Sequence, residues 1–170
     1  MTLKKATLIV HDKQYTGEAQ NITFMFNPTE ISFTRTVNWE RNSGNRSTSL
    51  LPKVNFSSVS PYELTLSNLM FDTYESGDSV MSKYIDNIKQ GVSARAAAPS
   101  RPPVYIFSWD KSYFHCVMSR LSYKLTMFLP NGTPVRAIVD ITLQEVDPAN
   151  LPGSSAFSKN AVRQANPALG

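Results

Sequence analysis

The chain has a single cysteine, two histidines and seven dispersed glycines in 170 residues, and each scarcity excludes a class of function. One thiol, Cys116, allows no disulfide within the chain, and its position in an apolar run predicts a small buried side chain in a reducing compartment. His11 and His115 lie at metal-ligand spacing from no other ligand, which predicts no metal site. The glycines form no phosphate-binding loop, so the sequence predicts no nucleotide or other cofactor.

Long hydrophobic runs and blocks of like charge are also missing. No stretch approaches membrane-spanning length, and too few apolar residues follow Lys4 and Lys5 for a signal peptide. We therefore expect a protein that is synthesised and assembled in the cytoplasm and makes no membrane contact by itself. The net charge of +4 comes from 17 basic and 13 acidic residues scattered along the chain. This dispersion does not favour a nucleic-acid partner.

The pattern of a β hairpin is the strongest positive signal. In residues 135–143 apolar side chains occupy one parity and polar side chains the other, apart from Ile138, as in a strand with one buried face. Residues 123–129 alternate in the same way, and a turn containing Asn131 and Gly132 separates the two runs. The result is a long antiparallel hairpin, residues 123–146. Its edges expose backbone donors and acceptors that must be paired or covered, and a partner chain is one possible cover.

The rest of the pattern predicts a mainly β fold with eight or nine strands and one helix. Further strands are expected at residues 5–10, 22–26, 31–39, 53–59, 62–71, 104–109 and 114–118. Residues 78–90 have apolar residues at helical spacing, with Asp78 as the expected N-cap and Gly91 at the end. We expect one domain, residues 1–148. A mobile loop is predicted at residues 41–49, and a flexible or partner-bound tail at residues 149–170.

Two groups of residues raise the question of chemistry. Asp72 and Glu75, with Asp78 beyond, suggest either a paired-carboxylate site or residues that cap and solvate a helix start, and we favour the second. His115 and Cys116 suggest a thiol and base pair, but neighbouring strand residues point to opposite faces and cannot meet. The sequence therefore predicts no enzyme.

Aromatic side chains provide an alternative function. A β barrel binds single-stranded nucleic acid by stacking bases on exposed aromatic rings. The candidates here are Trp39, Tyr105, Phe107, Trp109 and Tyr113. Alternation places these residues on both faces of their strands, so some must belong to the core, and a β sandwich or an oligomer interface accounts for the others.

Four blocks in order resemble the contractile injection system tube protein family. They are FMFNPTEISFTRTVNW (24–39), PKVNFSSVSPYELTLSNLMFDTYESGDSVMSKYI (52–85), RPPVYIFSW (101–109) and SYKLTMFLPNGTPVRAIVDITLQEVD (122–147). The resemblance covers about residues 3–148 and points to the tube-initiator or baseplate hub adaptor subunits of phage-tail-like particles. Many members carry a C-terminal LysM module, and this chain has a short Pro/Ala/Asn tail in its place, so peptidoglycan binding is not carried over.

The resemblance implies a tail-tube-like β sandwich or barrel: two packed antiparallel sheets and one helix. Six copies would form a ring whose extended hairpins join around a central channel. The implied partners are further copies in a hexamer, the inner tube protein, the baseplate hub or spike protein and other baseplate components. The ring would link hub to tube and template tube assembly. The candidate interface residues lie on the predicted strands or, for Arg41, at the start of the predicted loop, and charged residues there must meet a partner charge or water: Arg35, Trp39, Arg41, Arg136, Asp140 and Gln144.

Overall fold

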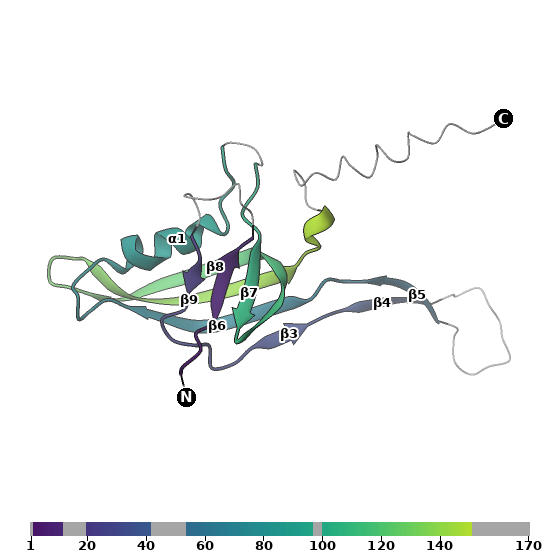
Figure 1. Cartoon of the computed structure of the whole chain (residues 1–170), viewed down its shortest axis with the longest axis horizontal. Helices are drawn as coiled ribbons and strands as arrows, with labels where there is room; N and C mark the ends of the chain where they lie inside the picture. The colour runs from purple at the N-terminus through teal and green to yellow at the C-terminus, as the bar shows by residue number, and fades with distance from the viewer. Residues whose placement is uncertain (1, 12–19, 42–53, 97–99, 151–170) are drawn as a thin grey trace.

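A computed structural model describes residues 2–11, 20–41, 54–96 and 100–150. The expected loop at 41–49, apart from Arg41, and the tail beyond 150 lie outside the described residues. The main element of the fold is one antiparallel sheet of seven strands in the order β2-β1-β7-β8-β9-β6-β3, with a helix packed on one face (Figure 1). The strands are β1 (Thr7–Val10), β2 (Ile22–Thr23), β3 (Ser32–Thr34), β6 (Glu63–Asp72), β7 (Tyr105–Trp109), β8 (Lys111–Phe128) and β9 (Pro134–Glu145).

The predicted long hairpin is confirmed as β8 and β9, which pair from Cys116 to Phe128 along β8. In β9 every odd residue from Val135 to Leu143 is buried, while the even residues between them are partly exposed. Gly132 closes the turn with a φ of +84°, and its N–H donates to the Leu129 carbonyl. Ile138, the one residue out of pattern, is only partly buried on the side of the sheet away from the core.

The core lies between the sheet and the helix. The helical segment has a π-helical turn, Met81–Ile85, that continues into α1, Asp86–Gln90, so the helix begins three residues later than expected. Val80, Ile85 and Ile88 are buried against strand residues such as Phe71. Gly91 ends the helix in a right-handed conformation, and a Cβ there would lie 2.7 Å from the Cε of Met118. Close packing therefore accounts for this glycine.

The expectation of Asp78 as N-cap is wrong. No side chain caps this helix start, and the Asp78 carboxylate instead accepts a hydrogen bond from the Lys83 ammonium at 2.9 Å. The Asp78 carbonyl accepts a hydrogen bond from the Thr73 hydroxyl at 2.6 Å. The loop before the helix is therefore held by its own contacts.

The expected two antiparallel sheets are present, but the second is a two-stranded ribbon. It consists of β4 (Val37–Arg41) and β5 (Val54–Val59), and every residue of both strands is exposed. The run at 31–39 forms two strands, because the chain leaves the large sheet after Thr34. The ribbon continues the β3–β6 pair outward and projects from one end of the molecule (Figure 1). The ribbon therefore does not form a second layer against the large sheet.

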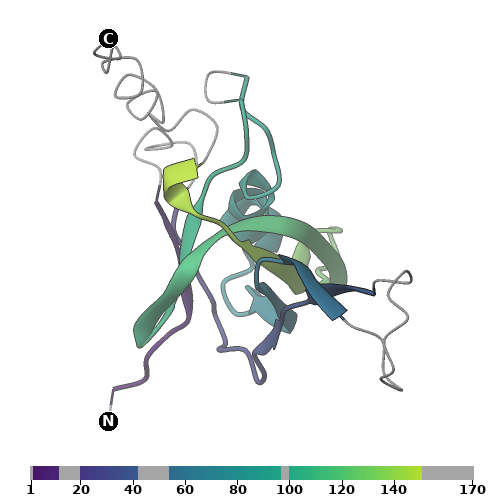
Figure 2. The same cartoon turned by 90° about the vertical axis from the view of Figure 1, so that its right-hand side faces the viewer.

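The seven-stranded sheet is curved and open, ending at β2 and β3, so the described residues form no closed barrel. Figure 2 shows β8 sweeping across the molecule. The curvature brings the β3 edge back toward the start of β8, where the Phe33 ring lies 5.9 Å from the Phe114 ring. One further helical turn, Pro148–Asn150, follows β9.

Candidate assembly interface

The ribbon formed by β4 and β5 has one apolar face and one polar face. Cross-strand pairs place Val37 beside Val59, Trp39 beside Phe56 and Arg41 beside Val54 on the first face. On the other face the Asn38 amide donates to the Ser58 hydroxyl at 3.1 Å, and the Ser57 hydroxyl donates to Glu40 at 2.9 Å. A register shift between Asn38 and Trp39 keeps the apolar residues of both strands on one face and the polar residues on the other.

The apolar face of the ribbon is open to solvent. Trp39 is 58% exposed and Phe56 60% exposed, and their rings meet edge to face with centroids 5.8 Å apart. A two-stranded ribbon alone is marginally stable in water, and a contiguous exposed apolar patch is typical of an interaction site. This face is therefore a candidate docking surface.

Arg41 ends the apolar face. Its guanidinium makes no ion pair or hydrogen bond with any other described side chain, and it lines a shallow hollow together with Val37, Trp39 and Val54. Arg35, by contrast, is held at the base of the ribbon. Its Nε donates to the Ser60 carbonyl at 2.9 Å and its guanidinium lies 4.7 Å from the centre of the Tyr62 ring. Arg35 thus fixes the direction in which the ribbon leaves the sheet.

Two long strand margins lack a neighbouring strand in the described part of the chain. β7 pairs with β8 only from Lys111 to Cys116, so residues 117–128 are paired with β9 on one side alone. β3 pairs with β6 only over residues 63–65, which leaves 66–72 without a strand on that side. There the Asp72 N–H faces the sulfur of Met25 at 3.2 Å. Uncovered margins of this length are templates for pairing with another chain.

Charges of opposite sign lie near these two margins. Arg120 and Lys124 are exposed on the uncovered half of β8, whereas Glu30 lies just before β3 and Glu63 lies on the part of β6 that β3 covers. None of these four side chains has an ion-pair or hydrogen-bond partner among the described residues. The uncovered half of β8 therefore carries two basic side chains, and two acidic side chains lie close to β3 at the other end of the sheet.

Three other predicted interface residues lie on β9, and two of them already have partners within the subunit. Asp140 accepts a hydrogen bond at 2.8 Å from the backbone N–H of Asn68, which lies at a bulge in β6 with a φ of +56°. Arg136 forms an ion pair with Asp72, with 2.5 Å between Nη2 and Oδ2. Gln144 is exposed and lies in register between Glu63 and residue 117.

The three acidic residues at 72, 75 and 78 do not converge. Asp72 accepts hydrogen bonds from the Tyr74 N–H and from Arg136, and these two interactions lower the pKa of its carboxyl. The Lys83 hydrogen bond lowers the pKa of Asp78. Glu75 has no such partner, and no group of three His, Cys, Asp or Glu residues suited to a metal occurs in the described ranges. Asp72 and Asp78 therefore hold the loop before the helix, and none of the three caps the helix start as the sequence predicted.

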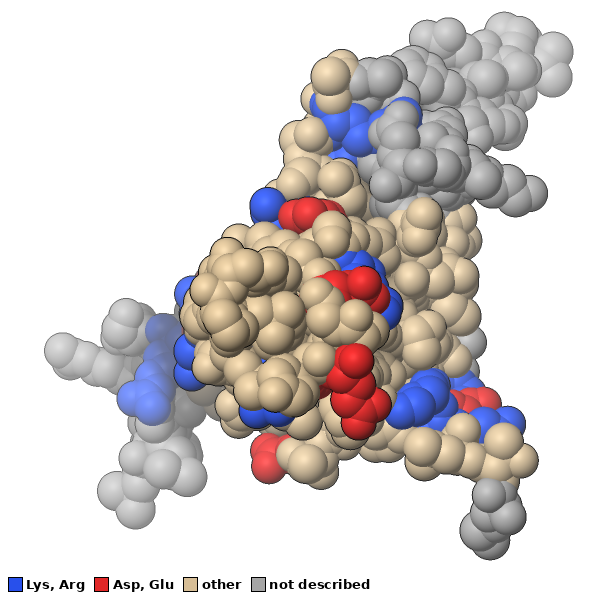
Figure 3. All heavy atoms as spheres, turned by 90° about the vertical axis from the view of Figure 1, so that its left-hand side faces the viewer, with Lys and Arg blue, Asp and Glu red and all other residues tan. Residues whose placement is uncertain are grey.

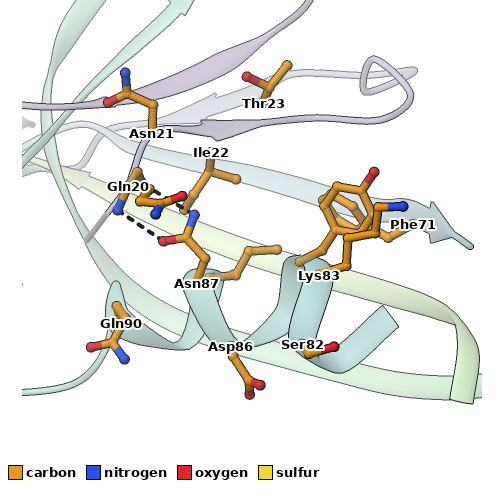
Figure 4. A pocket seen from close by; sticks show the side chains of 12 residues that line it. Gln20, Asn21, Ile22, Thr23, Phe71, Ser82, Lys83, Asp86, Asn87 and Gln90 are labelled. Carbon is orange, nitrogen blue, oxygen red and sulfur yellow. Dashed lines mark hydrogen bonds between the residues drawn. The ribbon is translucent and has the colours of Figure 1, made fainter. Parts of the chain in front are cut away.

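A second hollow, of about 420 Å³, lies between α1 and β2 (Figure 4). Asn87 spans it: its side-chain oxygen accepts from the Gln20 N–H at 3.1 Å, and its amide donates to the Gln20 carbonyl at 3.4 Å. Ile22 and Phe71 contribute apolar surface. The amide pair holds the segment before β2 on the helix, and the arrangement offers no nucleophile paired with a base.

The histidines and the cysteine are separated as the alternation predicted. Cys116 faces the core, where burial raises the pKa of its thiol to about 12. His115 points to the other face and meets His11 edge to face, with ring centroids 4.6 Å apart. Desolvation, then the neighbouring His11, lowers the pKa of His115. Because the Cys116 thiol is neutral and lies on the opposite face from His115, the two residues do not form a nucleophile and base pair.

The aromatic residues considered for base stacking do not form one surface. Tyr105 and Phe107 are buried, Trp109 is half-buried with its Nε1 donating to the Lys4 carbonyl at 3.2 Å, and Tyr113 packs on Phe107 with ring centroids 5.4 Å apart. Trp39 alone of the five lies on the ribbon. Sequence reasoning found Trp39 but missed Phe56, Val54 and Val59, because only the register of β4 against β5 places them on one face.

Comparison with protein family models identifies the family of this chain. Within the described ranges, no helix is long and apolar enough to span a bilayer. Comparison with curated proteins finds no match. The family model for contractile injection system tube proteins matches residues 2–152, which includes every strand of the sheet, the helix and the ribbon. By this match over most of its length, the chain belongs to the contractile injection system tube protein family.

Proposed function

We propose that this chain is a ring-forming structural subunit that links the baseplate hub or spike to the inner tube and templates the first layer of that tube. Six copies surround a channel, and the uncovered margin of β8 in one copy pairs with the uncovered margin of β3 and β6 in the next. Membership of the tube family supports a structural role in an injection particle. No catalytic step is part of this function.

The observation that carries the proposal is the pair of uncovered strand margins, with basic side chains on β8 and acidic side chains close to β3. Pairing them satisfies backbone groups on both copies and brings Arg120 and Lys124 toward Glu30 and Glu63. Because the two margins differ, the contact is head to tail, and head-to-tail contacts generate closed rings when the rotation closes. The inner tube protein, the hub or spike protein and other baseplate components are then the partners above and below the ring.

Charge exchange tests this pairing. We expect Arg120→Glu with Lys124→Glu to abolish rings, and Glu30→Lys with Glu63→Lys to do the same, because each places like charges along the contact. Combining all four substitutions should restore rings. Native mass spectrometry of subunits assembled on their hub counts the copies, and Lys89→Glu on the helix is the matched control. Rings that survive each double reversal would refute the pairing.

A further inference from the structure

The two histidines of the chain touch each other, although they lie in distant parts of the sequence. His11 directly follows β1, and His115 lies in β8, with β7 between the two strands. Their rings meet edge to face with centroids 4.6 Å apart. His115 is half-buried there, and His11 is exposed. The contact therefore joins two strands that are not direct neighbours in the sheet.

This contact lies where two segments leave the sheet. The His11 N–H donates to the Val104 carbonyl at 2.8 Å, one residue beyond the end of β1. The Val146 N–H donates to the His115 carbonyl at 3.0 Å, one residue beyond the end of β9. Both histidines thus take part in the backbone hydrogen bonds that fix these two exits. A change at the ring contact acts on both segments.

Histidine is the one side chain of this protein suited to respond to mild acid. Lysine, arginine and carboxylate side chains lie at several separate places on the surface in Figure 3, and these types keep their charges between about pH 5 and pH 8. The Cys116 thiol does not titrate in this range either, because burial raises its pKa to about 12. A charge change in mild acid is therefore concentrated at the histidine contact.

The contact favours a neutral His115. Burial, then the neighbouring His11, lowers the pKa of His115, while Asp147 acts in the opposite direction. These are the charged groups that face His115 among the described residues, since its neighbour on β7 is the uncharged Ile106. Once the contact opens, His115 enters water and its pKa returns to about 6.5. Below that pH, each further unit of acidity raises the open fraction by up to about tenfold, until the lowered pKa of the closed form is passed.

We propose that His11 and His115 form a proton-sensitive clasp that holds the end of β1 and the segment after β9 on the sheet at neutral pH and releases both in mild acid. Neutral rings pack edge to face, whereas protonated rings place like charges in contact. Every contact of the clasp lies within one subunit. The clasp therefore goes beyond the proposed ring and does not depend on it.

Hydrogen exchange on the full-length subunit tests the clasp. Between pH 7.5 and pH 5.5, after correction for the chemical exchange rate, the amides of His11 and Val146 should lose protection by up to about tenfold per pH unit below pH 6.5. The Thr73 amide, which donates to the Val135 carbonyl at 2.7 Å, is the internal control and should keep its protection.

Two variants assign the response to its residues. His115→Phe keeps an aromatic ring at the contact without the titrating group and should lose the acid response. His11→Phe should keep a smaller response, because burial still acts on His115. NMR titration of the unaltered protein, which requires neither variant, should give His115 a pKa below that of a histidine in water. An ordinary pKa for His115, an equal acid response in His115→Phe, or an equal loss of protection at Thr73 would overturn the clasp.

Discussion

Replacing Trp39 by serine should separate assembly from folding. Trp39 is 58% exposed in the lone subunit, and a tryptophan presents up to about 250 Å². About 145 Å² is therefore available for burial by a partner, which at about 25 cal/mol per Å² corresponds to roughly 3.6 kcal/mol. Incomplete burial and the ordering of side chains reduce this gain, so we expect about 2–4 kcal/mol, or roughly 30- to 1,000-fold weaker association.

The same substitution should change the free energy of unfolding of the isolated subunit by less than about 1 kcal/mol, since exposed positions contribute little. Light scattering over a range of subunit concentrations reports assembly, and urea denaturation reports stability. Leu3→Ser, which removes an exposed apolar side chain outside the ribbon, is the control. Assembly of Trp39→Ser at the concentrations that suffice for the unaltered protein would refute the assignment of the ribbon as a docking surface.

Three further predictions concern the subunit alone. Asp72→Asn removes the charge paired with Arg136 and should lower the free energy of unfolding by about 1–2 kcal/mol at pH 7. Because the pKa of Asp72 is lowered in the folded protein, this stability difference is present above about pH 4 and is lost as the pH falls through the folded pKa. Urea denaturation at pH 7 and pH 3 measures it. An Asp72→Asn variant that is as stable as the unaltered protein at pH 7 would contradict this prediction. Asn68→Val should lower the free energy of unfolding by about 1–2 kcal/mol, because residue 68 has a positive φ that a β-branched side chain does not tolerate, whereas Asn68→Gly should be tolerated. Equal melting temperatures for the two variants would argue against this backbone conformation at the bulge. The Cys116 thiol should resist iodoacetamide at pH 8 until the protein unfolds, and rapid alkylation of the native protein would show that it is not buried.

The hairpin and the core could be predicted from the sequence because their signals are local. Alternation in β9 and the Asn131-Gly132 turn identify two strands and their register without any distant contact. The helix was located for the same reason, since its apolar face repeats at helical spacing. Its exact start was missed because Asp78 has a competing partner, Lys83, which propensity alone does not reveal.

The candidate interface was harder to predict because its features depend on pairing between distant segments. The split of residues 31–39 into β3 and β4 follows from where the chain leaves the large sheet, and no residue in the run signals that point. Arg136 was predicted as an interface residue, yet the β6–β9 register places it opposite Asp72, 64 residues away, within the same subunit. Trp39 was predicted as an interface residue and lies on the apolar face of the ribbon, whereas its neighbours on that face required the β4–β5 register.

Cryo-electron microscopy of the assembled ring tests the central claim most directly, because it shows both the number of copies and the strands at each contact. The account predicts six copies, with residues 117–128 of β8 in each copy hydrogen-bonded to the β3–β6 margin of the next. A native particle that holds one isolated copy, with both strand margins facing water, would contradict it.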